Sequence, residues 1–462
     1  MTHPRPTAQA GEGEHVVPSV STAMSAPEPF APGSLVEHTA RSGLRIVTVR
    51  RPSVPVVELR LAVPFGGSDS RHAATAELLA AVLLQGTSGR DHVGVERILG
   101  EAGGSLRVSV TPERLTVEGA FAASGLLPAL GVLGEALADC RRAPDEVRTS
   151  RDRLGQRLRA YRAYPRTAAR EALLEHCFPG HPLAREVPAP EDVAVVEPER
   201  VSELHAAALL PRGSRLLLVG DLDPAPAAAA AERALDAWTG PRAAVPMPEL
   251  PVPAPGLAVT GRPGSRQAQI RLLASMPDTA DDRYPAVILA NAILGGFVGS
   301  RLAGRLREQD GLTYTVSTVL TEYPQRSLLA LNLDTSPAQL GTALAAIREE
   351  LDGFAKDRPP GSEEIAAARN YGLGSLVILP ASQTGTANLL HRLPPETALA
   401  RWLPDRWERI RGAADDDVRT AAAGMAARDF SGVVLTAPDH VDTAAAELDA
   451  AGFAAAIPVV VR

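Results

Sequence analysis

The sequence contains little cysteine, no excess of positive charge and no long apolar run, and each shortage excludes a class of protein. Cys140 and Cys177 are the only cysteines in 462 residues, so neither a disulfide framework nor a zinc module with cysteine ligands can be built. The formal net charge of −7 disfavours a surface that binds nucleic acid phosphates. No stretch is long and apolar enough to predict a membrane span.

The first 34 residues lack the apolar segment that a signal peptide requires. They mix Pro, Ser, Thr, Ala and Glu, a composition typical of a flexible tail. We therefore expect a tail over residues 1–34 on a cytoplasmic protein, and two cysteines fit a reducing compartment.

The remaining length and the 45% hydrophobic content predict two globular domains. Runs rich in Val, Ile and Leu predict strands over residues 43–51, 56–68 and 214–222. Apolar patterns bounded by Gly and Pro predict helices over residues 73–85, 95–102, 125–138, 144–163 and 167–176. Residues 241–256 are rich in Pro and have no periodicity, which is typical of an extended linker.

The same order of signals recurs beyond that linker. Residues 59–64, which precede a predicted helix, are echoed by residues 270–275, which precede an apolar segment over 284–294. The closing strand over 216–219 is echoed by residues 433–435. These echoes predict an α+β protein of two similar, duplicated α+β domains, residues 35–240 and 257–462, each a mixed sheet covered by helices. Two unrelated α+β domains remain the alternative.

A motif in the second half carries a resemblance to a known family. Residues 294–320, LGGFVGSRLAGRLREQDGLTYTVSTVL, resemble the C-terminal half of the pitrilysin/insulinase family of zinc metallopeptidases, where a Gly pair precedes Ser-Arg-Leu, Leu-Arg-Glu and Gly-Leu-x-Tyr. Shorter matches lie at residues 83–87, 178–185, 216–224, 266–272 and 363–370. The resemblance covers the chain from about residue 35 onward. It implies paired α+β domains whose sheets face a substrate cavity, and a clam-like dimer of which this chain is one half.

Active members of that family carry the helical signature His-x-x-Glu-His, which places two zinc ligands and a general base on one helix face. Counting back from Gly86 and Thr87, the equivalent positions hold Glu77, Ala80 and Ala81. Both His residues and the catalytic Glu of the signature are therefore replaced.

The family's third zinc ligand is a Glu that follows another Glu by seven residues. In this sequence those two positions hold Ser150 and Arg157. An arginine cannot ligate zinc, and its fixed charge would repel the ion. The resemblance thus implies a degenerate zinc site, no metal or other cofactor in this chain, and zinc in a partner subunit.

Other residues offer no replacement site. His176 and His181 flank Pro179 and Gly180 at a spacing that matches no usual zinc motif. His72 has no second His three or four residues away on its predicted helix. Residues 372–376, GLGSL, lack the Lys and the preceding strand of a phosphate-binding loop, and Ser-His-Asp chemistry has no local signature.

Two functional residues of the family are retained. Arg307 and Tyr314 match the Arg and Tyr that the C-terminal half contributes to the active centre, where both can donate hydrogen bonds to a carbonyl oxygen that gains negative charge. Ordinary surface and core roles for the two are the alternative. Further expected substrate-binding positions are Gly103 and Gly104, before a predicted hairpin, together with Ser300 and Arg301 after a flexible Gly pair.

The sequence thus predicts a non-catalytic, substrate-binding subunit of a heterodimeric zinc endopeptidase that cleaves short or extended peptides, with precursor or leader peptides as one substrate class. Its expected partners are a zinc-bearing paralogue and a peptide, with neither nucleic acid nor membrane. Two alternatives are a structural scaffold, like the core subunits of respiratory complexes, and a peptide-binding protein that has no protease partner.

Overall fold

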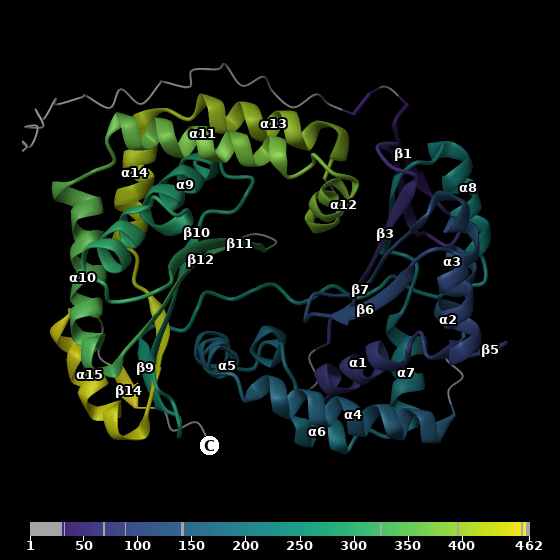
Figure 1. Cartoon of the computed structure of the whole chain (residues 1–462), viewed down its shortest axis with the longest axis horizontal. Coiled ribbons are helices and arrows are strands. Elements are labelled where there is room, and N and C mark those ends of the chain that lie inside the picture. The colour runs from purple at the N-terminus through teal and green to yellow at the C-terminus, as the bar shows by residue number, and fades with distance from the viewer. Residues whose placement is uncertain are drawn as a thin grey trace, which may run out of the picture.

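The computed structural model contains two six-stranded mixed sheets, one from each half of the chain (Figure 1). It describes residues 30–31, 33–67, 70–87, 89–139, 143–323, 326–394, 397–453 and 456–458. The expected tail over residues 1–34 lies almost wholly outside this described part, as does Cys140. Among the described residues, no helix combines the length and apolar character needed to cross a bilayer.

The first sheet and its helices come from residues 35–234. The strands are β1 (Leu35–Thr39), β2 (Arg45–Arg50), β3 (Val56–Pro64), β6 (Ser105–Val110), β7 (Arg114–Ala122) and β8 (Arg215–Gly220), with a small ladder of β4 (Gly86–Thr87) and β5 (Arg90–Asp91). The helices are α1 (Ser70–Val82), α2 (His92–Glu101), α3 (Leu126–Ala138), α4 (Pro144–Arg162), α5 (Pro165–Cys177), α6 (Pro190–Ala194), α7 (Pro198–Ala208) and α8 (Pro224–Ala234), with short 3-10 turns η1 (Ala123–Gly125) and η2 (Pro182–Arg185).

The second sheet and its helices follow the Pro-rich segment. The strands are β9 (Leu257–Gly261), β10 (Ala268–Met276), β11 (Val316–Tyr323), β12 (Arg326–Thr335), β13 (Ser431–Thr436) and β14 (Ala456–Pro458). The helices are α9 (Tyr284–Asn291), α10 (Leu340–Asp352), α11 (Ser362–Ile378), α12 (Gln383–Arg392), α13 (Leu399–Gly412), α14 (Asp415–Ala426) and α15 (Val441–Ala450), with π-helical segments η3 (Ala292–Gly296), η4 (Ala303–Gln309) and η6 (Gly353–Asp357) and 3-10 turns η5 (Pro337–Gln339) and η7 (Pro438–His440).

Five strands of each sheet follow the same order, which confirms the predicted pair of similar α+β domains. The edge strands differ, because β1 is the first strand of its half and is antiparallel to β2, whereas β14 is the last strand of its half and is parallel to β9. The first runs β1-β2-β8-β3-β7-β6, and the second, taken from its other edge, runs β14-β9-β13-β10-β12-β11. In both, two parallel strands (β2 with β8, β9 with β13) adjoin antiparallel pairings. The segments that resemble each other in sequence also occupy equivalent places in the two sheets. Arg60 of β3 lies opposite Leu217 of β8, and Arg271 of β10 lies opposite Val433 of β13.

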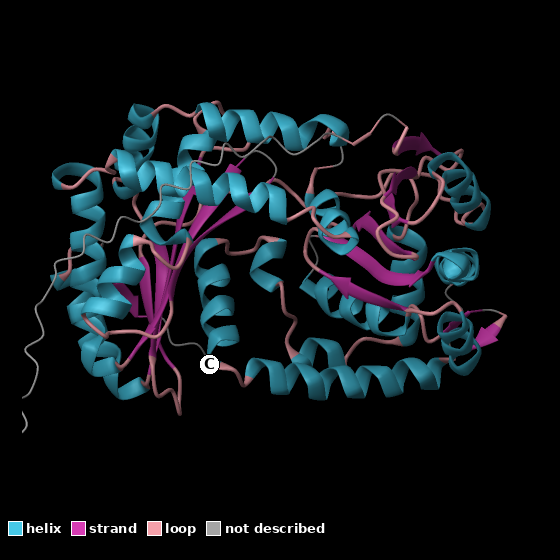
Figure 2. Cartoon of the chain, turned by 45° about the horizontal axis from the view of Figure 1, so that its top comes forward, coloured by secondary structure: helices cyan, strands magenta, loops and turns pink. Residues whose placement is uncertain are grey.

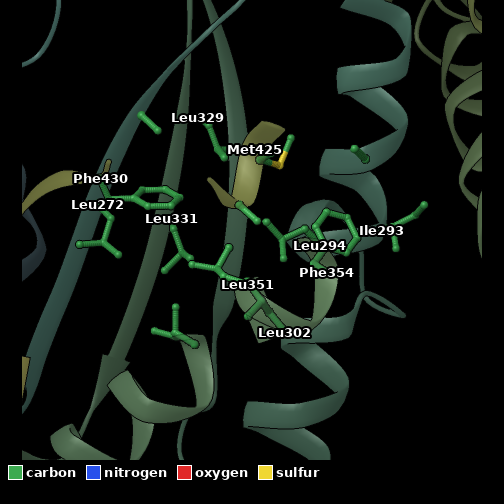
Figure 3. Packing of buried hydrophobic residues seen from close by; sticks show 14 of the residues in the cluster. Leu272, Ile293, Leu294, Leu302, Leu329, Leu331, Leu351, Phe354, Met425 and Phe430 are labelled. Atoms are coloured by element: carbon green, nitrogen blue, oxygen red, sulfur yellow. The ribbon is translucent and has the colours of Figure 1, made fainter. Parts of the chain in front are cut away.

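A hydrophobic core covers one face of each sheet. In the second half, Leu272, Leu329 and Leu331 project from the strands toward Leu294, Leu351 and Phe354 of the surrounding helices, with Met425 and Phe430 nearby (Figure 3). In the first half the equivalent core joins β3, β7 and β8 to α1, α3 and α4. Because strand residues alternate between faces, each sheet presents its second row of side chains on the opposite face.

Each sheet receives on that opposite face a helix from the other half of the chain. Helix α5 packs on β10 and β13, where Leu173, Leu174 and Phe178 form a buried cluster with Leu273 and Val433. Helix α12 packs in return on β2 and β8, in the cluster that contains its Leu390. Both helices lie between the two sheets (Figures 1 and 2). The two halves of the chain therefore exchange helices. The division predicted at residues 241–256 did not include this exchange of α5 and α12.

Candidate functional site

The positions equivalent to the zinc ligands meet where α1 lies against α4. Glu77, on α1, has its side chain 24% exposed, and its Oε2 lies 3.8 Å from Nη2 of Arg157 on α4. Both side chains line a cavity of about 340 Å³, together with Tyr161, Arg170 and other residues. The two positions that the sequence analysis paired are thus adjacent, and they form a carboxylate–guanidinium ion pair.

Burial raises the pKa of the Glu77 carboxyl above its ordinary value, and the positive charge of Arg157 opposes that rise. The guanidinium itself is largely exposed, at 66% of its side chain. Glu77 therefore has a cation as its neighbour, where a zinc site would have further anionic or neutral ligands.

The other two positions of the signature contribute only methyl groups. Ala80 is 9% exposed, packed in the first-half core, and Ala81 follows it on the same helix. Within the described residues, no group of three or more His, Cys, Asp or Glu side chains is arranged to hold a metal ion. The role of these positions as a degenerate site, and the absence of a cofactor, stay predictions.

The histidines weighed in the sequence analysis contact backbone carbonyls instead. His72 Nε2 lies 3.1 Å from the oxygen of Phe65, and His176 Nε2 lies 2.9 Å from that of Gly256. His181 caps η2 by accepting a hydrogen bond from the amide of Leu183. Residues 372–376 lie inside α11 and form no loop.

Tyr314 projects from a loop between η4 and β11 that its neighbours hold in place. The hydroxyl of Thr313 donates to the carbonyl oxygen of Asp334 at 2.7 Å and accepts from the amide of Thr315 at 3.1 Å. Gly311 adopts a φ of +62°, a conformation that favours glycine, where the chain leaves the helix. With its backbone anchored on both sides, the Tyr314 side chain is 89% exposed.

Arg307 lies on η4 and turns away from the core that Leu306 enters. Its side chain is 42% exposed, and its nearest charged partner is Glu308, at 3.5 Å. Neither Arg307 nor Tyr314 lines the cavity at Glu77. Both polar groups therefore remain accessible, and their catalytic role stays a prediction.

The four expected substrate-binding positions lie in tightly packed surroundings. A Cβ at Gly104 would lie 1.9 Å from the oxygen of Ala120, and Gly103 has a φ of +73°, so both glycines are required where the chain enters β6. Ser300 is buried, and Arg301 donates to both carboxylate oxygens of Glu364. These contacts are structural, and a role in substrate binding stays a prediction for all four.

A second cavity, which the sequence analysis missed, lies between α5 and the second sheet. Its lining includes Arg166 and Arg170 of α5, together with Arg271, Asp334 and Tyr323 from the strands. Burial raises the pKa of the Tyr323 phenol to about 12. Arg271 belongs to residues 266–272, one of the shorter segments that resemble the family. No pattern in the sequence predicts that α5 lies opposite this residue.

Comparisons with known proteins agree with this architecture. Residues 45–191 match the family model described as insulinase (peptidase family M16), and residues 196–371 match the model described as peptidase M16 inactive domain. The chain is 22% identical over 404 residues to an uncharacterized zinc protease of Mycobacterium bovis, covering 86% of this chain and 92% of that protein. It is 23% identical over 410 residues to an uncharacterized zinc protease of Streptomyces coelicolor, covering 86% and 88%.

Solved structures share the fold. A peptidase M16 inactive domain from Pseudomonas fluorescens superposes with a TM-score of 0.77 at 21% identity, covering 87% of this chain and 98% of that chain. A protease from Helicobacter pylori gives a TM-score of 0.77 at 15% identity, covering 87% and 99%. At these identities the likeness establishes the fold alone.

Proposed function

The chain belongs to the insulinase family of peptidases, family M16, and from this premise we propose that it is a non-catalytic, peptide-binding subunit of a heterodimeric zinc endopeptidase. In this proposal the zinc site belongs to a paralogous partner, and this chain contributes Arg307 and Tyr314 to it. The substrates are short or extended peptides, with precursor or leader peptides as one class.

The observation that carries the proposal is the ion pair at the degenerate site. Arg157 approaches Glu77 at 3.8 Å, and Ala80 and Ala81 complete the family's ligand and base positions with methyl groups. One carboxylate is too few for a zinc site, which takes three protein ligands when it is catalytic. The position of the signature Glu holds Ala80, whose methyl group cannot deprotonate a water.

The exposure of Arg307 and Tyr314 supports a role in a partner's site. A phenol hydroxyl and a guanidinium donate hydrogen bonds, and both are directed away from the core of their own chain. Across a dimer interface they could bind the carbonyl oxygen of the bond being cleaved and stabilise its negative charge in the transition state. The partner's zinc supplies the activated water. A purely structural scaffold has no need of this accessible pair.

Co-expression with each zinc-bearing paralogue of the source organism tests the proposal. We expect one paralogue to co-purify with this chain, zinc to be bound at one ion per heterodimer, and peptide hydrolysis to require both subunits. The matched control is the same complex with the zinc-binding His residues of the partner replaced, which should assemble without activity. Tightly bound zinc in the isolated chain, or no complex with any paralogue, would contradict the proposal.

A further inference from the structure

The cavity under α5 has a volume of about 410 Å³, within the range of small-ligand pockets. Its floor is the face of the second sheet that lies away from the core, and its roof is one face of α5. Because the strands of the floor are in register, their side chains form rows across β11, β12 and β10.

Neighbouring rows of the floor differ in polarity. One row contains Ser317, Asn332 and Arg271, and the next row along the strands contains Val319, Ala330 and Leu273. Helix α5 repeats this change, because Arg166 and Arg170 precede Leu173 and Leu174 on its cavity face. The cavity thus has a polar, cationic end and an apolar end.

At the polar end, Asp334 is held between two arginines. Its Oδ1 accepts a hydrogen bond from Nη2 of Arg271 at 2.6 Å, and its Oδ2 accepts one from Nε of Arg166 at 3.1 Å. Arg271 also donates to the carbonyl oxygens of Ile270 and Leu333 and to Oε1 of Gln269, so both of its Nη atoms are engaged. These three charged side chains carry one positive charge in excess.

That excess charge is available at Arg166. Its side chain is 70% exposed, and no described residue accepts a hydrogen bond from its two Nη atoms. The side chains of Asn332 and Ser317 line the same end and also make no hydrogen bond to a described residue. Arg170 is also partly exposed, at 53% of its side chain, but it forms a two-point ion pair with Glu186 that compensates its charge.

The equivalent place in the first half is closed. Arg60, the counterpart of Arg271, pairs with Glu58 at 2.9 Å, and both side chains are less than 10% exposed. Its remaining donors bind Asn388 of α12 and backbone oxygens. The open cationic end under α5 is therefore a feature of the second half and not a general result of the duplicated packing.

We propose that this cavity binds a carboxylate of an extended peptide, through the Nη atoms of Arg166 and the polar side chains of Asn332 and Ser317. Apolar side chains next to that carboxylate lie on the row of Val319 and Leu273. The carboxylate belongs to the peptide's C-terminus or to an acidic side chain. This inference rests on the proposed peptide-binding function.

The location fits one continuous path for a peptide. Arg170 and Leu174 line both this cavity and the cavity at Glu77, so the two adjoin at α5. A peptide anchored by its carboxylate under α5 can therefore extend along α5 into the cavity at Glu77 and Arg157.

Binding of four labelled peptides to the full-length chain tests the inference. The first is Ala-Ala-Leu-Ala-Leu with a free C-terminus, and the second is its C-terminal amide. The third and fourth are amides in which the last Leu is replaced by Glu or by Gln. We expect the free acid to bind at least about tenfold more tightly than the C-terminal amide, or the Glu peptide to bind at least about tenfold more tightly than the Gln peptide. In each pair the neutral peptide lacks the charge-assisted hydrogen bond to Arg166.

The substitution Arg166→Gln should remove that preference, so that each acidic peptide binds no more tightly than its neutral match. Because Arg166 is largely exposed, the variant should fold, and Arg401→Gln on α13, whose side chain is 79% exposed, is the matched control. If the preference survives Arg166→Gln, or if the unaltered chain binds acid and amide equally, the carboxylate-binding inference is wrong. Neither result contradicts the proposed function. If no peptide binds to the chain or to its heterodimer, the proposed function itself fails.

Discussion

At the scale of one residue, Tyr314 differs in its surroundings from a tyrosine that packs in the core. A buried tyrosine packs its ring in the core and gives its hydroxyl a hydrogen-bond partner, as Tyr284 does when it donates to Glu322. Tyr314 exposes the whole ring, at 89%, although Thr313 and Gly311 fix the backbone beside it. Such an exposed aromatic ring on an anchored loop is typical of a side chain that contacts another molecule.

We therefore predict that Tyr314→Phe in the assembled heterodimer lowers kcat about a hundredfold or more, on the order of 3 kcal/mol, because one donor to the developing oxyanion is lost. Assembly should be unchanged, since the ring remains. Steady-state kinetics on the purified complex measure the first quantity, and analytical ultracentrifugation measures the second. Full activity of Tyr314→Phe in an intact complex would assign the tyrosine a structural role only.

His391 is a second residue whose surroundings determine a measurable property. Burial, and after it the positive charges of Arg114, Arg215, Arg60 and Arg392, lower its pKa to about 3. The folded protein therefore keeps this imidazole neutral, while the unfolded chain binds a proton below its ordinary pKa of about 6.5. Unfolding takes up a proton between these two values, so the free energy of unfolding falls as the pH drops from about 6.5 toward 3.

The substitution His391→Gln should reduce that acid sensitivity. We expect the slope of unfolding free energy against pH, between pH 4 and 6, to decrease by about one proton, or about 1.4 kcal/mol per pH unit. Urea denaturation at several pH values provides the slope. His92→Gln, on the exposed first turn of α2, is the control and should leave it unchanged. Equal slopes for the unaltered protein and for His391→Gln would show that His391 is not the group responsible.

At the scale of the element, helix α5 is held by side chains from the other half of the chain. Phe178, at its C-terminus, is fully buried in the cluster with Leu273 and Val433. Phe178→Ala should lower the free energy of unfolding by about 3–5 kcal/mol, because it removes a large buried side chain and leaves a cavity. Chemical denaturation provides the measurement. Leu127→Ala, at a side chain 60% exposed on α3, should cost within about 0.5 kcal/mol. A similar small cost for Phe178→Ala would mean that α5 does not depend on this contact.

The sequence predicted helices α1 to α5 and the segment that contains α9, but it predicted neither the remaining helices nor where the helices pack. The helix expected over residues 144–163 is α4, Pro144–Arg162, because Pro at its first position and an apolar stripe are local signals. The helix expected over 73–85 is α1, Ser70–Val82, shifted by three residues at each end. Periodicity gives the apolar face of a helix, but it does not specify the sheet that covers that face. The exchange of α5 and α12 was therefore not predictable from pattern.

Helix α12 was missed altogether for a related reason. Its inward face carries polar side chains, and Gln383 donates to three backbone oxygens of the first half, those of Arg51, Val54 and Val56. Because Gln383 and Thr386 share this buried face with Ala387 and Leu390, the apolar stripe of the helix is short. In the same way, the family's motif assigned Glu77 and Arg157 to one degenerate site, but their ion pair and the cationic cavity at Arg166 required the three-dimensional packing of the helices.

At the scale of the whole molecule, the exchange joins the two halves into one cooperative unit. Helix α5 and helix α12 each contribute buried leucines to the opposite sheet. Arg215, itself 4% exposed on β8, donates to the carbonyl oxygens of Leu390 and Leu393 at the end of α12. Those carbonyls have no partner within their own helix, so this buried arginine supplies the hydrogen bonds that the helix end requires.

The connection through residues 241–256 should therefore be dispensable once the protein has folded. We predict that a protease recognition sequence inserted between the exposed Pro251 and Val252 can be cut without separating the halves. Size-exclusion chromatography of the cut protein should give one peak that contains both fragments, because neither half can withdraw its exchanged helix without exposing a buried cluster. The matched control adds Leu390→Asp, which places a charge in the cluster under α12 and should let the fragments separate after cutting. Separation of the fragments without that substitution would mean that the linker, and not the exchange of helices, holds the halves together.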